Sequence, residues 1–340
     1  MAGDLDGWEV VGCDLCGSQR NATFIAVEAQ HSKAQRPVTL VRCLSCGLVY
    51  LNPRPNQAKI GEFYSSSYYA HADMERRQKL LRARFRNRFL EGLGGYGRSL
   101  DLRMIRKLAP VGLVDVIIPA TLRGRLLDVG CGDGERVDWY QARGFEAYGV
   151  EISGRAVENA RKLGLRVEQG ILSDANYPDG FFDVIVMAHV LEHTHSPQAY
   201  LQECFRILKP GGVLAVAVPN IESHSASVLQ ENWSFLMLPI HLYHFSVGTL
   251  TEYMRKNGFD IVSLVGKLVY PRMVRSSCRN ARQNRPFPAY AKAWLRSGIL
   301  PTACASLKGG VRKYETITTY CVKQSLAPAV REAPISAFHS

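Results

Sequence analysis

The sequence predicts an α/β fold in which helices connect the strands of a mostly parallel sheet. Three observations favour it: short apolar runs alternate with stretches of helical periodicity between residues 125 and 265, a glycine-rich turn follows the first run, and a late β-rich run spans Thr316–Val322. Parallel strands need long crossovers, usually helical, so such alternation is typical of a parallel sheet. We expect Thr316–Val322 to return as the seventh strand.

Each expected element follows from its local pattern. The other six strands are expected at Arg125–Val129, Glu146–Val150, Arg166–Glu168, Phe182–Met187, Val213–Val218 and Asp260–Val265. Helices are expected at Glu135–Arg143, Gly154–Leu163, Pro197–Leu208 and Ser246–Asn257. The chain then divides into a cysteine-containing module at 8–55, a basic helical segment at 56–122, the α/β domain at 123–325 and a disordered tail at 326–340. Within the α/β domain, 266–314 forms a basic insertion before the last strand.

Length and composition limit the class of protein. The chain has 340 residues, of which 46% are hydrophobic, enough for a full core. No apolar run reaches the roughly 18 to 20 residues that a bilayer-spanning helix needs. The first nine residues contain three acids and no Lys or Arg, unlike a secretory signal. We therefore expect a cytoplasmic protein.

The net charge of +12 is unevenly distributed. Residues 76–107 contain eleven Lys or Arg against two acids, and residues 261–314 contain eleven more and no acid. Such asymmetry predicts an anionic partner: a membrane face, a nucleotide- or lipid-linked diphosphate, or nucleic acid. A basic, solvated surface without a specific partner is the alternative.

The glycine-rich turn carries the first functional signal. The apolar strand ending at Val129 runs into Gly130-Cys131-Gly132-Asp133-Gly134, which lets the backbone approach a ligand closely. A dinucleotide-binding turn would have its third glycine or an alanine where Glu135 stands. Carboxylates at Asp133 and Glu135 would repel a pyrophosphate, whereas a sulfonium ligand tolerates them. Glu151 ends the next strand, where a carboxylate can accept hydrogen bonds from both ribose hydroxyls.

This stretch resembles the class I, Rossmann-like methyltransferases. The resemblance continues through Phe182–Ile185, Val190–His193 and Leu208–Leu214, and implies S-adenosylmethionine as cofactor. In the family's pattern Gly130, Cys131 and Gly132 form the cofactor turn, which Asp128 organises. Glu151 would hold the ribose, Ile152 the adenine ring and Asp174 the adenine amino group, and His189 would line the cofactor or acceptor pocket. An ordinary loop cap is the alternative role for Asp174.

Two Cys-x-x-Cys pairs point to a metal. Cys13 with Cys16 and Cys43 with Cys46 form two similar knuckles, each followed by glycine. Four thiolates make a closed tetrahedral zinc site, which is structural because no coordination position stays open. Redox chemistry, the alternative, would need one pair in a thioredoxin-like context. The continuation Gly47–Pro55 resembles the zinc ribbon that precedes methyltransferase domains in bacterial sugar and polysaccharide biosynthesis, which implies a ribbon near the acceptor side.

Histidines supply the candidates for a catalytic base. Methyl transfer needs an aligned acceptor and removal of its proton, which a neutral imidazole can accept. We expect His241 to be the base, with His189 and His244 as further candidates; a packing or helix-start role is the alternative for His244, and a buried structural role for any of them. No Asn-Pro-Pro-Tyr motif follows the strand ending at Met187, which argues against nucleobase methylation.

The sequence thus predicts a methyltransferase acting on a small molecule. The expected acceptor is a hydroxyl or carbon of a nucleotide- or lipid-linked sugar in glycan or secondary-metabolite biosynthesis. The acid-free zone 261–314 also predicts peripheral contact with an anionic membrane. An RNA-binding methyltransferase and a scaffold that binds the cofactor without turnover are the alternatives, and the absence of basic motifs interleaved with aromatics disfavours nucleic acid.

Overall fold

The structure is a computed structural model that describes residues 6–28, 34, 36–64, 116, 118, 122–267, 275–280 and 308–324. Most of the predicted basic segment 56–122 and most of the predicted insertion 266–314 lie outside these residues, as does the whole tail 326–340. What the sequence predicts for those segments therefore stays a prediction.

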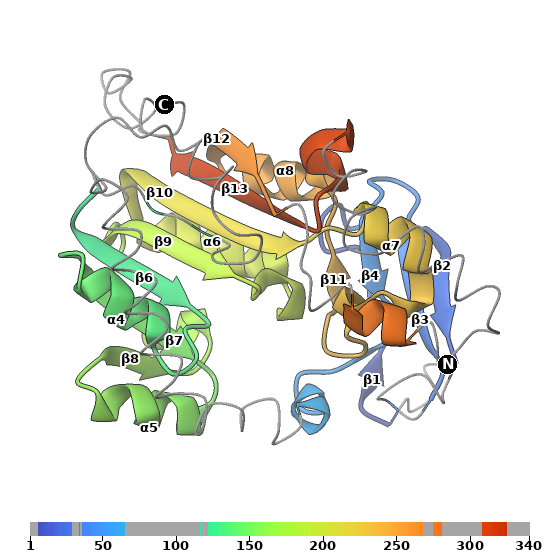
Figure 1. Cartoon of the computed structure of the whole chain (residues 1–340), viewed down its shortest axis with the longest axis horizontal. Helices are drawn as coiled ribbons and strands as arrows, with labels where there is room; N and C mark the ends of the chain where they lie inside the picture. The colour runs from blue at the N-terminus through green and yellow to red at the C-terminus, as the bar shows by residue number, and fades with distance from the viewer. Residues whose placement is uncertain are drawn as a thin grey trace.

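A seven-stranded sheet forms the centre of the chain, with the strand order β12-β13-β10-β9-β6-β7-β8 (Figure 1). Its strands are β6 (Arg125–Val129), β7 (Glu146–Glu151), β8 (Arg166–Gln169), β9 (Phe182–Ala188), β10 (Leu208–Pro219), β12 (Phe259–Val265) and β13 (Thr316–Lys323). Strands β6 to β10 pair in parallel, and β13 runs antiparallel to both of its neighbours. The predicted mostly parallel, seven-stranded sheet is confirmed, including the late strand, which returns between β10 and β12.

Helices connect the parallel strands, and serine caps set where the three longest of the described helices begin. The helices are α4 (Glu135–Gln141), α5 (Gly154–Lys162), α6 (Pro197–Ile207), α7 (His224–Leu229) and α8 (Val247–Lys256), with short 3-10 turns at η4 (Leu172–Ala175), η5 (Leu191–His193), η6 (Gln230–Asn232), η7 (Ser234–Leu236) and η8 (Gly310–Lys313). The side chains of Ser153, Ser196 and Ser246 accept hydrogen bonds from backbone N–H groups in the first turns of α5, α6 and α8. Such caps satisfy N–H groups that have no partner within the helix.

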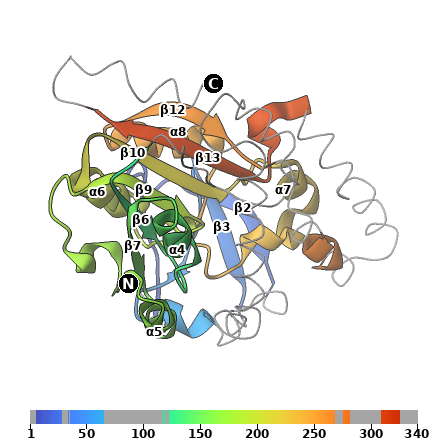
Figure 2. The same ribbon diagram turned by 60° about the vertical axis from the view of Figure 1, so that its left-hand side comes forward.

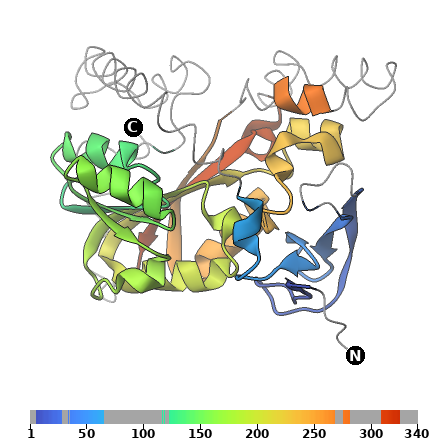
Figure 3. The same cartoon turned by 90° about the horizontal axis from the view of Figure 1, so that it is seen from below.

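Alternate residues of the central strands face two separate apolar layers. Leu127 and Val129 pack with residues of α6 and α8, whereas Leu126 packs with Val137 of α4 and Val157 of α5. Figure 3 shows the two helix pairs on opposite sides of the sheet. Because strand side chains alternate between faces, a sheet covered on both sides needs near-continuous apolar strands, and β6 and β9 have them.

The N-terminal module contributes three strands to a second, four-stranded sheet with the order β11-β4-β3-β2 (Figure 1). Figure 2 shows β2 and β3 of this sheet beside each other, below β13. Its strands are β2 (Asn21–Val27), β3 (Val38–Cys43), β4 (Val49–Leu51) and β11 (Tyr243–His244); β1 (Trp8–Glu9) pairs with β5 (Arg54–Pro55), and the 3-10 turn η2 (Ile60–Phe63) follows. Strand β11 belongs to the α/β domain, and its Tyr243 lies opposite Tyr50 of the module. The module and the α/β domain therefore share one sheet.

A buried arginine strengthens this junction. Arg54 donates hydrogen bonds to Glu9 at 2.7 Å, to the His195 carbonyl at 2.8 Å and to the Tyr243 hydroxyl at 2.8 Å. These bonds join the module to the loop after η5 and to β11, and they satisfy a guanidinium whose residue is only 8% exposed. No helix among the described residues combines the length and apolarity needed to cross a membrane.

Candidate cofactor and acceptor site

The glycine turn after β6 has a backbone conformation that favours glycine. Gly130, Gly132 and Gly134 have φ angles of +67°, +58° and +84°, in the left-handed region that side chains disfavour. A Cβ at Gly130 would come within 2.4 Å of Val190, whereas a Cβ at Gly132 would meet no protein atom within 4 Å. Gly132 therefore leaves open space beside the turn, where a ligand can approach the backbone.

Two carboxylates hold this turn in place. Asp128 is fully buried, and both of its oxygens accept hydrogen bonds from Arg136 Nε at 3.0 Å. Burial raises the pKa of Asp128, against the opposing effect of Arg136. Glu151, at the end of β7, accepts hydrogen bonds at 2.9 Å from the backbone N–H groups of Gly132 and Ser153. Each carboxylate oxygen can accept a further hydrogen bond, so Glu151 keeps capacity for a ligand.

A cavity of about 930 Å³ opens at the carboxyl ends of the strands. Its lining includes the glycine turn with Glu151 and Ile152, parts of α5, α6 and the loop 170–173, and the segment after β9 with His189 and His193. Residues between 57 and 64, which directly follow the N-terminal module, complete it. Its volume is at the upper end of the range for small-molecule sites, which leaves room for two ligands side by side.

The structure separates the predicted cofactor residues into two groups. Gly130, Gly132, Glu151, Ile152 and His189 line the cavity. Ile152 is 51% exposed, so it presents apolar surface on which a flat ring can lie.

The remaining predicted residues lie outside the cavity lining. Asp128 acts through Arg136, as described above, which agrees with the predicted organising role. Cys131 is buried, with its Sγ against Gly149 of β7. Asp174 is exposed, and its carboxylate accepts the backbone N–H of Ile171 at 3.0 Å. Asp174 therefore has the loop-cap role that was the alternative in the sequence, while its neighbours Ile171, Leu172 and Ser173 line the cavity.

Comparison with known proteins identifies the ligand. A profile of the methyltransferase domain family matches residues 75–264, more than half of the chain. The chain belongs to the S-adenosylmethionine-dependent methyltransferases. The residues present fit this cofactor: Gly132 gives the open approach, Glu151 the hydrogen-bond acceptors and Ile152 the apolar platform.

Individual relatives of the methyltransferase cover only part of it. A probable S-adenosylmethionine-dependent methyltransferase of Mycolicibacterium smegmatis is 29% identical over 42% of the chain and 54% of its own length. A ubiquinone biosynthesis O-methyltransferase of Methylococcus capsulatus is 26% identical over 49% of the chain and 76% of its own length. The chain thus spans about half the length of the first relative and three quarters of the second. A methyltransferase structure from Archaeoglobus fulgidus aligns with 65% of the chain and 92% of its own at 18% identity, with a TM-score of 0.42.

The acceptor end of the cavity is lined by histidines after β9. His189 Nδ1 lies 3.3 Å from Oε1 of the buried Glu192. His193 Nδ1 lies 3.1 Å from the carbonyl of Ile240 and 3.1 Å from the hydroxyl of Tyr64. Because a carbonyl only accepts hydrogen bonds, His193 carries its proton on Nδ1.

The predicted base His241 does not line the cavity. It is 3% exposed, its Nδ1 donates to the Phe235 carbonyl at 2.8 Å, and its ring packs edge-on against His193 with centroids 4.4 Å apart. His244 is equally buried in β11, and its ring lies 6.2 Å from His241. Burial lowers the pKa of His241 well below its usual value and that of His244 to about 3, so both rings are neutral at pH 7. Neither ring is among the residues that line the cavity, so the choice of the base stays a prediction.

Sequence reasoning missed the contribution of residues 57–64. Gln57, Ala58, Ile60, Gly61 and Tyr64 all line the cavity, although the sequence predicts the start of a basic helical segment here. Nothing in their local pattern marks them as site residues. The usable signal was the resemblance to a zinc ribbon that lies near the acceptor side, because these residues directly follow that module.

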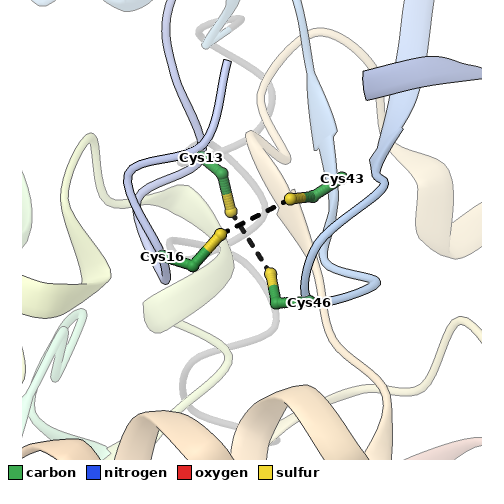
Figure 4. A group of neighbouring side chains, drawn as sticks. All are labelled: Cys13, Cys16, Cys43 and Cys46. Atoms are coloured by element: carbon green, nitrogen blue, oxygen red, sulfur yellow. Dashed lines mark hydrogen bonds between the residues drawn. The ribbon is translucent and has the colours of Figure 1, made fainter. Parts of the chain in front are cut away.

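The four predicted metal-ligating cysteines come together at the junction of the two knuckles (Figure 4). Cys13 Sγ lies 3.4 Å from Cys46 Sγ, Cys16 Sγ lies 3.5 Å from Cys43 Sγ, and all four sulfurs lie within 4.8 Å of one another. Sulfurs bound to one zinc at about 2.3 Å lie roughly 3.8 Å apart, so the cluster fits a tetrahedral ion. Burial acts to raise the pKa of Cys43, but hydrogen bonds from the backbone of Cys46 and Ser45 outweigh it and lower that pKa to about 6. Burial raises the pKa of Cys13 and raises that of Cys46 to about 11. Of these three thiols, only Cys43 favours the thiolate form that a metal requires.

Proposed function

We propose that this methyltransferase methylates a hydroxyl or carbon of a nucleotide- or lipid-linked sugar in glycan or secondary-metabolite biosynthesis. The observation that carries the proposal is the cavity of about 930 Å³, which extends from the cofactor turn to a histidine-lined end closed by the N-terminal module. That end supplies polar groups and a proton acceptor for a small substrate. The name of the Methylococcus relative, a ubiquinone biosynthesis O-methyltransferase, also supports a small-molecule acceptor.

We assign the base to His189, one of the three histidines that the sequence predicts. His189 lines the cavity, and the carboxylate of Glu192 lies 3.3 Å from its Nδ1. A carboxylate at Nδ1 favours the tautomer whose Nε2 accepts a proton. When bound, S-adenosylmethionine supplies an electrophilic methyl group, so the protein must align the acceptor and take up its proton.

The backbone of His189 is consistent with a functional constraint. Its φ angle is +59°, which is rare for a residue with a side chain, and its N–H donates to the Ala217 carbonyl at 2.8 Å. Strained backbone of this kind clusters at active sites, where the surrounding structure enforces it. The ring lies parallel to that of Phe235, with centroids 6.2 Å apart, which fixes its plane beside the cavity.

We further propose that Cys13, Cys16, Cys43 and Cys46 bind a structural zinc ion. The module they hold supplies β4, which pairs with β11, and leads directly into residues 57–64, five of which line the cavity. An ion at this position stabilises one wall of the acceptor site and takes no part in the chemistry.

The experiment that tests the acceptor class is a mass measurement. The purified chain is incubated with S-adenosylmethionine and extracted nucleotide sugars, lipid-linked sugars or total RNA in separate reactions. The proposal predicts a mass increase of one methylene group in a sugar fraction, and methylation confined to RNA would overturn it.

A substitution of His189 tests the assignment of the base. His189→Ala should lower turnover about 10²–10⁴-fold while binding of S-adenosylhomocysteine is retained. His224→Ala, on α7 and outside the cavity lining, is the matched control and should keep full turnover.

A further inference from the structure

A second group of metal-ligating side chains lies behind the acceptor end of the cavity. Glu192 and His193 belong to η5, and His241 precedes β11, 48 positions after His193. One potential ligand atom of each residue lies within 4.8 Å of those of the other two. This cluster is formed by different residues from the four cysteines, and it combines one carboxylate with two imidazoles.

Backbone carbonyls fix both imidazoles in the form that binds a metal. His193 Nδ1 donates to the Ile240 carbonyl at 3.1 Å, and His241 Nδ1 donates to the Phe235 carbonyl at 2.8 Å. Each ring therefore keeps the lone pair on Nε2. Metal-ligating histidines almost always donate their second ring N–H to a carbonyl or carboxylate, because this sets the tautomer and the ring orientation.

The carboxylate of Glu192 points to a cation. Glu192 is 1% exposed, and neither of its oxygens has a hydrogen-bond partner among the described residues. Among the same residues, its one ion-pair contact is with Nδ1 of His189 at 3.3 Å. A buried carboxylate without hydrogen bonds is costly unless a cation compensates its charge.

We propose that Glu192, His193 and His241 bind one divalent transition-metal ion. Two imidazoles and a carboxylate suit zinc, cobalt, iron or manganese, whereas magnesium and calcium prefer oxygen ligands alone. Ligand atoms held at about 2.1 Å from an ion lie roughly 3.0–3.4 Å from one another. Binding of the ion therefore requires a small inward movement of the three side chains. Three protein ligands leave coordination positions for water or substrate.

The position of the ion suggests a role in acceptor binding. His193 lines the cavity, so an acceptor oxygen that enters there can complete the coordination of the ion. A bound divalent ion lowers the pKa of a coordinated hydroxyl, which would ease transfer of its proton to His189. This role rests on the proposed function, whereas binding of the ion does not.

The test uses Co²⁺ as the probe on the full chain loaded with one zinc at the cysteine cluster. Calorimetric titration should show one further Co²⁺ bound per chain. The visible spectrum of the complex should show the weak absorption of nitrogen and oxygen ligands and no intense thiolate charge-transfer band. Glu192→Gln, which keeps the size of the side chain, and His193→Asn, which keeps a polar group near Nδ1 but removes Nε2, should each weaken Co²⁺ binding by on the order of 100-fold. Glu222→Gln and His224→Ala, outside the cluster, are the matched controls and should bind as the unsubstituted chain does.

The outcomes separate the metal site from the proposed function. Binding of S-adenosylhomocysteine by each variant verifies that it has folded. Zinc-loaded chain that binds no Co²⁺, or a Glu192→Gln variant that folds and binds Co²⁺ unchanged, would overturn the inference. One Co²⁺ bound through this cluster, with no sugar methylated, would sustain the metal site and refute the acceptor proposal.

Discussion

The carboxylate of Asp14 accepts a hydrogen bond of 2.9 Å from the hydroxyl of Tyr253, a residue 239 positions later in the chain. Asp14 lies inside the first cysteine knuckle, and Tyr253 is a fully buried residue of α8. The same carboxylate accepts from the Ser196 hydroxyl at 2.8 Å and from the backbone N–H of Gln198 at 3.0 Å, at the start of α6. One side chain of the cysteine-containing module therefore anchors two helices of the methyltransferase domain.

Asp14→Ala should lower the free energy of unfolding by about 1–3 kcal/mol, because the buried Tyr253 hydroxyl loses its acceptor. The shift of the urea midpoint measures this loss. Asp138→Ala, at an exposed position of α4, is the matched control and should stay within about 0.5 kcal/mol. Equal, small shifts in both variants would show that Asp14 does not stabilise the junction.

Glu151→Gln should weaken binding of S-adenosylhomocysteine by about 10–100-fold. The substitution removes a charged acceptor from the N–H groups of Gly132 and Ser153, and hydrogen bonds to charged groups contribute roughly 1.5–3 kcal/mol. Calorimetric titration measures the dissociation constant. Glu168→Gln, exposed on β8 and outside the cavity lining, should leave that constant unchanged. The assignment of Glu151 fails if both variants bind alike.

Cys43→Ser should abolish stoichiometric zinc and lower the melting temperature, since binding free energy at a structural zinc site contributes directly to folding. We expect a loss on the order of several kcal/mol. Metal analysis and thermal unfolding are the measurements. Ser45→Ala, whose exposed hydroxyl contacts Ser18, is the control within the same knuckle and should retain zinc. Full zinc content in Cys43→Ser would rule out the four-cysteine site.

Glu315 predicts a distinct pH dependence of stability. Burial raises the pKa of this fully buried carboxyl from 4.5 to about 7, against the opposing effect of Ser225 and Trp233. Between these values the folded chain holds a proton that the unfolded chain releases, so the stabilisation is complete below pH 4.5 and is lost as the pH rises towards 7. Relative to Glu315→Gln, the unsubstituted chain should lose on the order of 3 kcal/mol between pH 4.5 and 7.5. Parallel pH profiles of the urea midpoint in the two proteins would contradict this.

Much of the fold could be predicted because its signals are local. The strand over Arg125–Val129 agrees with β6 at both ends, and the other predicted strands and helices of the α/β domain agree with the structure to within a few residues. The largest difference is at β10, which begins at Leu208 rather than Val213, with a register irregularity between these residues. Alternating apolar runs specify such elements directly, whereas an irregular pairing depends on the neighbouring strand.

The candidate site could be predicted only in part. The glycine turn and Glu151 follow from backbone geometry within a few residues of each strand end. The burial of each histidine could not be predicted in this way. Tyr243 and His244 pair with β4, which lies about 190 positions earlier in the chain, and His241 is buried beside them. Burial of a loop depends on what packs over it, and a periodicity within the loop does not report that.

The sequence by itself determined the cofactor turn, the cysteine knuckles and the positions of the strands along the chain, since each rests on residues adjacent in the chain. The tertiary structure alone decided three things: that residues 57–64 form a wall of the cavity, that His189 rather than His241 lines its acceptor end, and that His193 and His241 meet beside Glu192. Each of these depends on contacts between distant segments, whose geometry is set by the pairing of β11 with β4 and the packing of both sheets.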